Sequence, residues 1–89
     1  MLILIVYDVS TDTPEGRTRL RKVSRACRDY GKRVQNSVFE CEVDTGQLLK
    51  VKNRLVNLID IETDSLRFYH LSNNLNNRVE HFGVKQSFD

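Results

Sequence analysis

A single carboxylate, Asp8, ends the first apolar run of the chain. Leu2 to Val6 are all aliphatic, Tyr7 follows, and Asp8 is the first charged side chain. Acids often mark the end of a strand, so Asp8 has a simple structural role as one alternative. A strand end is also a rigid platform at which ligands gather, and carboxylate oxygens suit a hard cation such as Mg²⁺. The sequence around Asp8 holds no D-x-D, H-x-H or acidic cluster that would complete such a site within one chain.

A second copy of the chain would supply the missing ligand. If a two-fold axis passes close to the end of this strand, two Asp8 carboxylates and several waters form a weak cation site. A cation there polarises a phosphoryl oxygen and activates a bound water for attack on a phosphodiester. Asp8 is thus the predicted metal ligand and catalytic residue. Tyr7 is a further catalytic candidate beside the metal, with a core aromatic carrying a polar tip as the alternative.

A basic segment follows at residues 17–33. It holds eight of the fourteen Lys and Arg residues and one of the twelve acids, a net charge of +7 against +2 for the whole protein. Solvated helix faces usually mix charges of both signs, whereas a segment of one sign is typical of a polyanion-binding surface. We predict that it binds nucleic-acid phosphates through a stripe along one flank of a helix, formed by Arg17, Arg21, Arg25 and Arg28.

Capping signals and apolar spacing predict the elements around these residues. Thr13 followed by Pro14 begins one helix, and Gly31 is expected to supply its left-handed end. Asp44 and Gln47 have the spacing of a capping box at the start of a second helix. The expected extended segments are 2–7, 33–43, 64–71 and 78–84. The 33–43 segment forms either one strand or two short strands divided at Gln35-Asn36-Ser37.

This order predicts one α+β domain over residues 1–89, a two-layer sandwich with both helices on one face of a mainly antiparallel sheet. The first strand, however, is apolar on both faces, because a half-buried strand would alternate. The second face needs a cover, and we predict that another copy of the chain provides it in a homodimer.

Other features narrow the class of protein. No apolar run approaches the roughly 20 residues of a membrane span, so we expect a cytoplasmic protein without membrane contact. Cys27 and Cys41 lack C-x-x-C spacing and a nearby His pair, which predicts buried thiols instead of a disulfide or a zinc site. His70 and His81 have no catalytic partner in sequence, so structural roles are expected for both.

Three motifs together resemble the CRISPR-associated protein two family. They are YDV at 7–9, GRTRLRKV at 16–23 and, most specifically, RVQNSVFEC at 33–41. The resemblance covers essentially the whole chain in order and spacing. DYG at 29–31 and DSLRFYHL at 64–71 are similar to the type I-C branch.

The resemblance implies a ferredoxin-like βαββαβ fold, a homodimer with sheets packed face to face, and Mg²⁺, with Mn²⁺ as a substitute, held by Asp8 of each subunit. Family members are described as metal-dependent endonucleases acting on single-stranded RNA or double-stranded DNA. In spacer acquisition the dimer bridges CRISPR integrase dimers along the prespacer duplex. Arg17, Arg19 and Arg33 match basic positions of the family and Phe39 an aromatic one, each near the Asp or the nucleic acid. Relatives often carry a further C-terminal tail that docks on a partner. Whether such a tail is missing here stays an open question.

Three functions are therefore compared. The first is a dimeric nuclease centred on the paired Asp8. The second is a non-catalytic dimeric scaffold that bridges integrase dimers and prespacer duplex DNA. The third is a ferredoxin-like regulatory module that binds a small ligand at its dimer interface, and it leaves the basic segment without a role.

Overall fold

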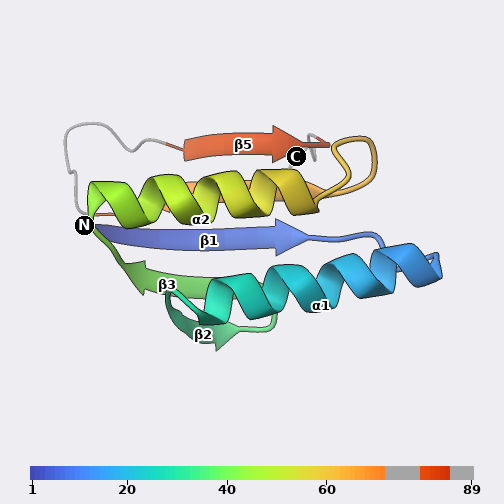
Figure 1. Ribbon diagram of the computed structural model, residues 1–89, viewed down its shortest axis with the longest axis horizontal. Coiled ribbons are helices and arrows are strands. Elements are labelled where there is room, and N and C mark those ends of the chain that lie inside the picture. The colour runs from blue at the N-terminus through green and yellow to red at the C-terminus, as the bar shows by residue number, and fades with distance from the viewer. Residues whose placement is uncertain (72–78, 85–89) are drawn as a thin grey trace, which may run out of the picture.

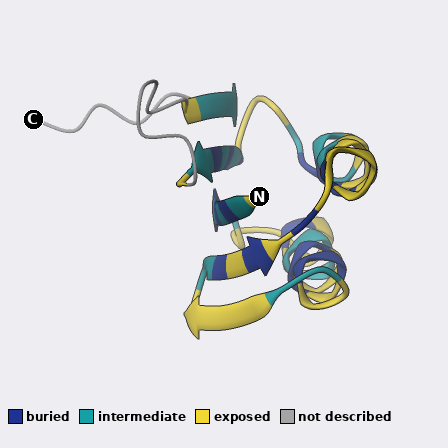
Figure 2. Cartoon of the chain, turned by 90° about the vertical axis from the view of Figure 1, so that its left-hand side faces the viewer, coloured by how far each residue is buried: buried dark blue, intermediate teal, exposed yellow. Residues whose placement is uncertain are grey.

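A five-stranded antiparallel sheet with two helices on one face forms the protein (Figures 1 and 2). The computed structural model describes residues 1–71 and 79–84. The strand order is β2-β3-β1-β4-β5, so β1, the strand that carries Asp8, lies in the centre. The elements are β1 (Leu2–Asp8), α1 (Pro14–Arg28), β2 (Lys32–Gln35), β3 (Val38–Glu42), α2 (Thr45–Leu58), β4 (Ser65–His70) and β5 (Val79–Gly83).

The predicted ferredoxin-like α+β fold is confirmed. The first four strands and the two helices follow the βαββαβ order, and β5 adds an edge strand beside β4. The 33–43 segment divides into β2 and β3 as expected, with an irregular register between Arg33 and Gln35. The pairing resumes between Gln35 and Val38, on either side of the turn at Asn36 and Ser37. This turn lies beside the end of β1, where the Tyr7 N–H donates to the Ser37 carbonyl at 3.1 Å.

Side-chain caps start both helices where the sequence predicts them. The Thr13 hydroxyl accepts from the Gly16 N–H at 3.0 Å before α1. Asp44 and Gln47 form the reciprocal capping box of α2, with distances of 2.8 and 2.9 Å. Each cap satisfies N–H groups that the first turn of a helix leaves without a partner inside the helix.

The predicted role of Gly31 is wrong. Gly83 is the one residue of the described ranges with a positive φ, so Gly31 does not end α1 in a left-handed conformation. It is required for close packing instead. A Cβ at position 31 would lie 2.3 Å from the Cys41 Sγ and 2.5 Å from the Glu40 carbonyl oxygen, so only glycine lets the chain turn so tightly against β3.

The two faces of β1 differ in burial. Ile3, Ile5 and Tyr7 point toward the helices and are almost fully buried. Leu2, Leu4 and Val6 alternate to the other face and are only half-buried in one chain. No helix in the described part of the chain covers that side (Figure 2). We call it the open face: Leu2, Leu4 and Val6 with their cross-strand neighbours Val38, Glu40, Arg67 and Tyr69.

Both cysteines are free and buried, as predicted. Burial raises the pKa of the Cys27 thiol to about 12 and that of Cys41 to about 11. The thiolate is the reactive and metal-binding form, so these residues act as small core hydrophobes.

Neither helix among the residues described is long and apolar enough to cross a membrane.

Candidate metal and nucleic-acid site

Asp8 is the last residue of β1, opposite Ser65 of β4. Its side chain is exposed, and strand alternation directs it to the side of the sheet that carries the open face. Within residues 1–71 and 79–84, no three His, Cys, Asp or Glu side chains come close enough to hold a metal ion together. One chain therefore presents a carboxylate that is accessible to a cation but does not complete a coordination shell.

Tyr7 lies on the opposite side of the sheet from Asp8. Its ring is buried beneath α1 and stacks on the Phe39 ring with centroids 6.2 Å apart. Its hydroxyl donates to the Asn36 carbonyl oxygen at 3.4 Å. The structure thus brings together the predicted residues Tyr7 and Phe39 beneath the helices. A direct role of the Tyr7 hydroxyl at the metal stays a prediction.

Arg33 of β2 is fixed in place before any ligand binds. Its Nη2 donates to the Ser24 hydroxyl of α1 at 2.6 Å. The guanidinium carbon also lies 5.3 Å from the centroid of the Phe39 ring, within the range of a cation–π contact. Phe39 therefore acts as a platform for Arg33, and Arg33 connects β2 to the middle of α1.

Four of the predicted arginines surround one concave site. A pocket of about 390 Å³ lies between α1 and the β2–β3 turn. Within the described ranges, none of its arginines forms an ion pair with a carboxylate. We call it the arginine pocket: it is lined by Arg21, Arg25, Arg28 and Arg33 together with Tyr7, Leu20, Ser24, Asn36 and Ser37.

The other two predicted arginines lie outside the pocket. Arg17 is exposed near the start of α1, and its Nη1 donates to the Thr11 carbonyl oxygen at 3.2 Å. Arg19 is held by Asp64, with 2.9 Å between its Nε and the Asp64 Oδ2. The Arg19 guanidinium therefore already has an anionic partner within the chain. Direct contact of Arg17 or Arg19 with nucleic acid stays a prediction.

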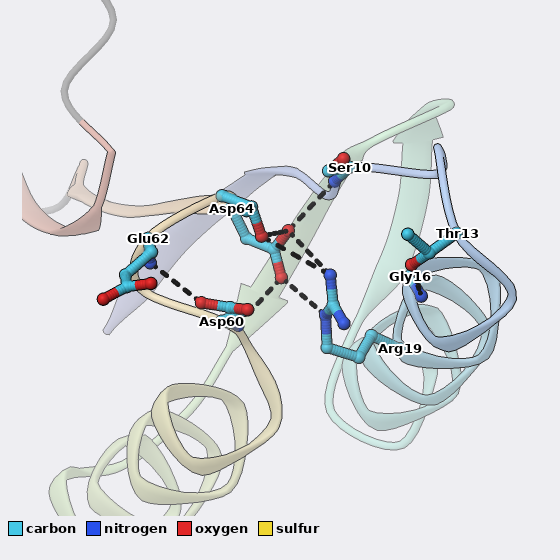
Figure 3. A network of polar contacts seen from close by, with 8 residues as sticks. Ser10, Thr13, Gly16, Arg19, Asp60, Glu62 and Asp64 are labelled. Atoms are coloured by element: carbon cyan, nitrogen blue, oxygen red, sulfur yellow. Dashed lines mark hydrogen bonds and ion pairs between the residues drawn. The ribbon is translucent and has the colours of Figure 1, made fainter.

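Asp64 is a fully buried carboxylate that the sequence reading did not select (Figure 3). Besides Arg19, it accepts from the backbone N–H groups of Ser10 and Asp60, each at 2.9 Å, and from the Thr63 hydroxyl at 3.1 Å. Burial opposes its ionisation, but these hydrogen bonds outweigh burial and hold the pKa of Asp64 below its usual range. Asp64 therefore joins the loop after Asp8 to α1 and to the segment before β4.

Close backbone packing also holds the loop that follows Asp8. A Cβ at Gly16, in the first turn of α1, would lie 2.0 Å from the Ser10 carbonyl oxygen. The Ser10 N–H donates to the Asp64 carboxylate. The N–H and the carbonyl oxygen of Ser10 therefore both lie against fixed neighbours, Asp64 and Gly16. The end of β1 is consequently a rigid platform, and Asp8 is only two residues from its anchor point.

Comparisons with known proteins agree with this architecture and with the motifs. Residues 1–79 match the family model of the CRISPR associated protein Cas2. The chain is 58% identical over 89 residues to the CRISPR-associated endonuclease Cas2 of Halalkalibacterium halodurans, covering 100% of this chain and 93% of that protein. It is 53% identical over 89 residues to the CRISPR-associated endoribonuclease Cas2 of Chlorobaculum tepidum, with the same coverage of both.

A solved structure is similar as well. The crystal structure of Streptococcus pyogenes Cas2 at pH 6.5 superposes with a TM-score of 0.75 and 54% sequence identity, covering 93% of this chain and 100% of that one. Sequence and fold thus agree over nearly the whole length, which confirms the family resemblance of the three motifs. The chain belongs to the CRISPR-associated Cas2 family.

Proposed function

We propose that this protein is a dimeric, Mg²⁺-dependent endonuclease of CRISPR spacer acquisition, of the type I-C branch. It cleaves phosphodiester bonds of single-stranded RNA or double-stranded DNA with a metal held by Asp8 of both subunits. Relatives that match the full chain are named endonuclease or endoribonuclease. The observation that carries the proposal is the position of Asp8, exposed at the end of the central strand and on the side of the half-buried open face.

The open face supports a homodimer with sheets packed face to face. Its centre is aliphatic, and covering it with the same face of another chain would remove apolar surface from water. Two of its polar side chains, Arg67 and Tyr69, already have partners within one chain. Arg67 donates from Nε to His81 Nδ1 at 3.0 Å and from Nη1 to the Tyr69 hydroxyl at 3.2 Å. Their internal hydrogen bonds lower the cost of covering them.

The donor set fits Mg²⁺ only as a pair. Mg²⁺ is usually bound by one or two carboxylates and keeps several waters, so two Asp8 side chains across the two-fold axis are sufficient. When bound there, the ion supplies Lewis-acid chemistry, polarising a phosphoryl oxygen and activating water. The protein holds each Asp8 on a strand end anchored through Ser10 and Asp64. The arginines of α1, which lie on the helix side of the sheet, bind flanking phosphates of the substrate.

Nucleic-acid binding is expected to weaken steeply with salt. Each phosphate contact releases condensed counterions, so four to six contacts per site give a slope of log affinity against log salt of roughly −4 to −5. Because arginines on phosphates carry no base information, affinity should depend little on sequence. A filter-binding titration with two duplexes of unrelated sequence measures both effects. A slope near zero would contradict the electrostatic interpretation.

A scaffold function is the second candidate. The arginine pocket lies on the helix side of the sheet, away from the face to which Asp8 points. A duplex bound along α1 therefore does not need the carboxylate, and the same dimer can bridge integrase dimers without cleaving. An Asp8→Asn variant separates the two functions. Nuclease function requires loss of cleavage, and scaffold function requires retained spacer acquisition in cells that express the variant.

A further inference from the structure

We propose that the arginine pocket holds one unpaired nucleotide of a bound strand, with its phosphate on the arginines and its base against Leu20 and Tyr7. This inference rests on the proposed function and identifies what one part of the basic surface binds. The pocket lies between α1 and the β2–β3 turn, so its walls come from two different elements. A volume of about 390 Å³ falls in the lower part of the range of roughly 300–1,000 Å³ typical of small-ligand sites.

The charge around the pocket requires an anionic group. Arg21, Arg25 and Arg28 follow one another on α1 at spacings of four and three, so they lie on the same flank of the helix. Arg33 faces them from β2. None of the residues that line the pocket is an acid. A phosphate matches this arrangement, because guanidinium groups bind its oxygens with two hydrogen bonds at a time.

The inner wall of the pocket has a different character. Leu20 packs against the hydrophobic core and remains partly accessible, and Tyr7, whose side chain is almost fully buried, lines the same wall. Asn36, from the turn, adds an amide that both donates and accepts hydrogen bonds. Inorganic phosphate would use the arginines alone. A ligand that uses both parts of the pocket carries a phosphate and a flat, partly apolar ring with polar edges, as a nucleotide does.

The geometry also excludes a base-paired nucleotide from the pocket. Bases inside a duplex are stacked and paired, and a base enters a pocket only from a single strand, a strand end or a flipped position. Arg33 is already fixed by Ser24 and Phe39, so one wall exists before the nucleotide arrives. A preformed wall lowers the entropy that binding costs.

The pocket and Asp8 lie at the same end of the sheet. Tyr7 lines the pocket and directly precedes Asp8, and consecutive Cα atoms are about 3.8 Å apart. Their side chains point to opposite faces of β1. The proposed nucleotide therefore lies on the helix side of the strand end whose other face carries Asp8.

Calorimetric titration of the full chain with 5′-UMP, uridine and inorganic phosphate tests this inference. We expect 5′-UMP to saturate below about 1 mM and to bind at least about tenfold more tightly than either fragment. Arg28→Ala should weaken 5′-UMP binding about tenfold, because it removes a charge-assisted contact. Lys22→Ala is the matched control. Lys22 is an exposed cation on the same helix that does not line the arginine pocket, and this variant should change affinity less than twofold.

Three results would overturn the inference: no saturation of 5′-UMP by about 1 mM, equal affinity for 5′-UMP and inorganic phosphate, or equal losses in Arg28→Ala and Lys22→Ala. The second result indicates simple anion binding and the third indicates diffuse attraction by the helix. The salt titration of duplex binding on the same preparations separates this inference from the proposed function. Steep salt dependence without 5′-UMP binding would reject the pocket alone, and absence of both would reject both.

Discussion

Replacing Asp8 by Asn is expected to reduce Mg²⁺-dependent cleavage by at least about a hundredfold while leaving the fold intact. Metal chemistry contributes several kcal/mol to transition-state stabilisation, and about 2.7 kcal/mol corresponds to a hundredfold in rate. The amide keeps the shape of the carboxylate but removes the negative charge that attracts the cation. The side chain is exposed, so thermal stability should change little.

Cleavage of single-stranded RNA and of duplex DNA, with Mg²⁺ and with EDTA, measures this loss. Asp12→Asn serves as the matched control, since it makes the same change at an exposed acid in the loop beyond β1. Wild-type protein and Asp12→Asn should cleave equally, and EDTA should stop both. Cleavage that persists in Asp8→Asn preparations of equal purity would show that the carboxylate is not part of the nuclease site or that a contaminant cleaves the substrate, and a further purification step distinguishes these cases.

Asp64→Asn is expected to lower the free energy of unfolding by an amount near the lower end of the about 3–5 kcal/mol typical of breaking a buried ion pair. The carboxylate is fully buried and accepts from four groups, whereas its partner Arg19 remains partly exposed. Urea unfolding followed by circular dichroism measures the change. Asp29→Asn is the control, because it makes the same replacement in the exposed Arg54–Asp29 pair and should cost less than about 1 kcal/mol.

The pH dependence of this effect has a defined sign. The pKa of Asp64 is lowered in the folded state, so its contribution to stability is fully present above the ordinary Asp pKa and is lost as the pH falls through the folded-state value. The difference in stability between wild type and Asp64→Asn should therefore be constant near neutral pH and shrink below about pH 4. A difference that is small at neutral pH, or that grows on acidification, would contradict the assigned role of Asp64.

Local signals in the sequence predicted most of the fold. Thr13 with Pro14, and Asp44 with Gln47, mark helix starts through contacts within four residues, and the structure contains both caps. The uninterrupted apolar run before Asp8 predicted a strand that is apolar on both faces, and the structure places this strand at the centre of the sheet. These inferences need no knowledge of distant partners.

The role of Asp64 could not be predicted from local signals in the sequence. Its contacts with Ser10 and Arg19 join residues 54 and 45 positions apart, and no periodicity links them. One signal was present: Arg19 projects toward the apolar side of its helix, where a cation needs a buried anionic partner. The prediction for Gly31 was wrong for a similar reason. Glycine is required at position 31 because of close packing against Cys41 and Glu40 of β3, and not because of the end of α1.

The sequence predicted the arginines that α1 contributes to the arginine pocket, but not the concave shape of the site. The stripe on α1 follows from helical spacing, so Arg21, Arg25 and Arg28 were expected to share a face. Concavity depends on how the β2–β3 turn folds beside α1 and on the contacts that fix Arg33. Sequence therefore predicted a basic surface, and the tertiary structure turned part of it into a pocket.

Pairing of two Asp8 residues is the central claim, and subunit mixing tests it most directly. Wild-type and Asp8→Asn chains are unfolded together, refolded at constant total concentration and assayed for cleavage as the wild-type fraction varies. If only dimers with two Asp8 residues are active, activity follows the square of that fraction, and an equal mixture retains about a quarter of full activity. A linear dependence, with about half of the activity in the equal mixture, would show that each chain cleaves alone and would contradict the paired site.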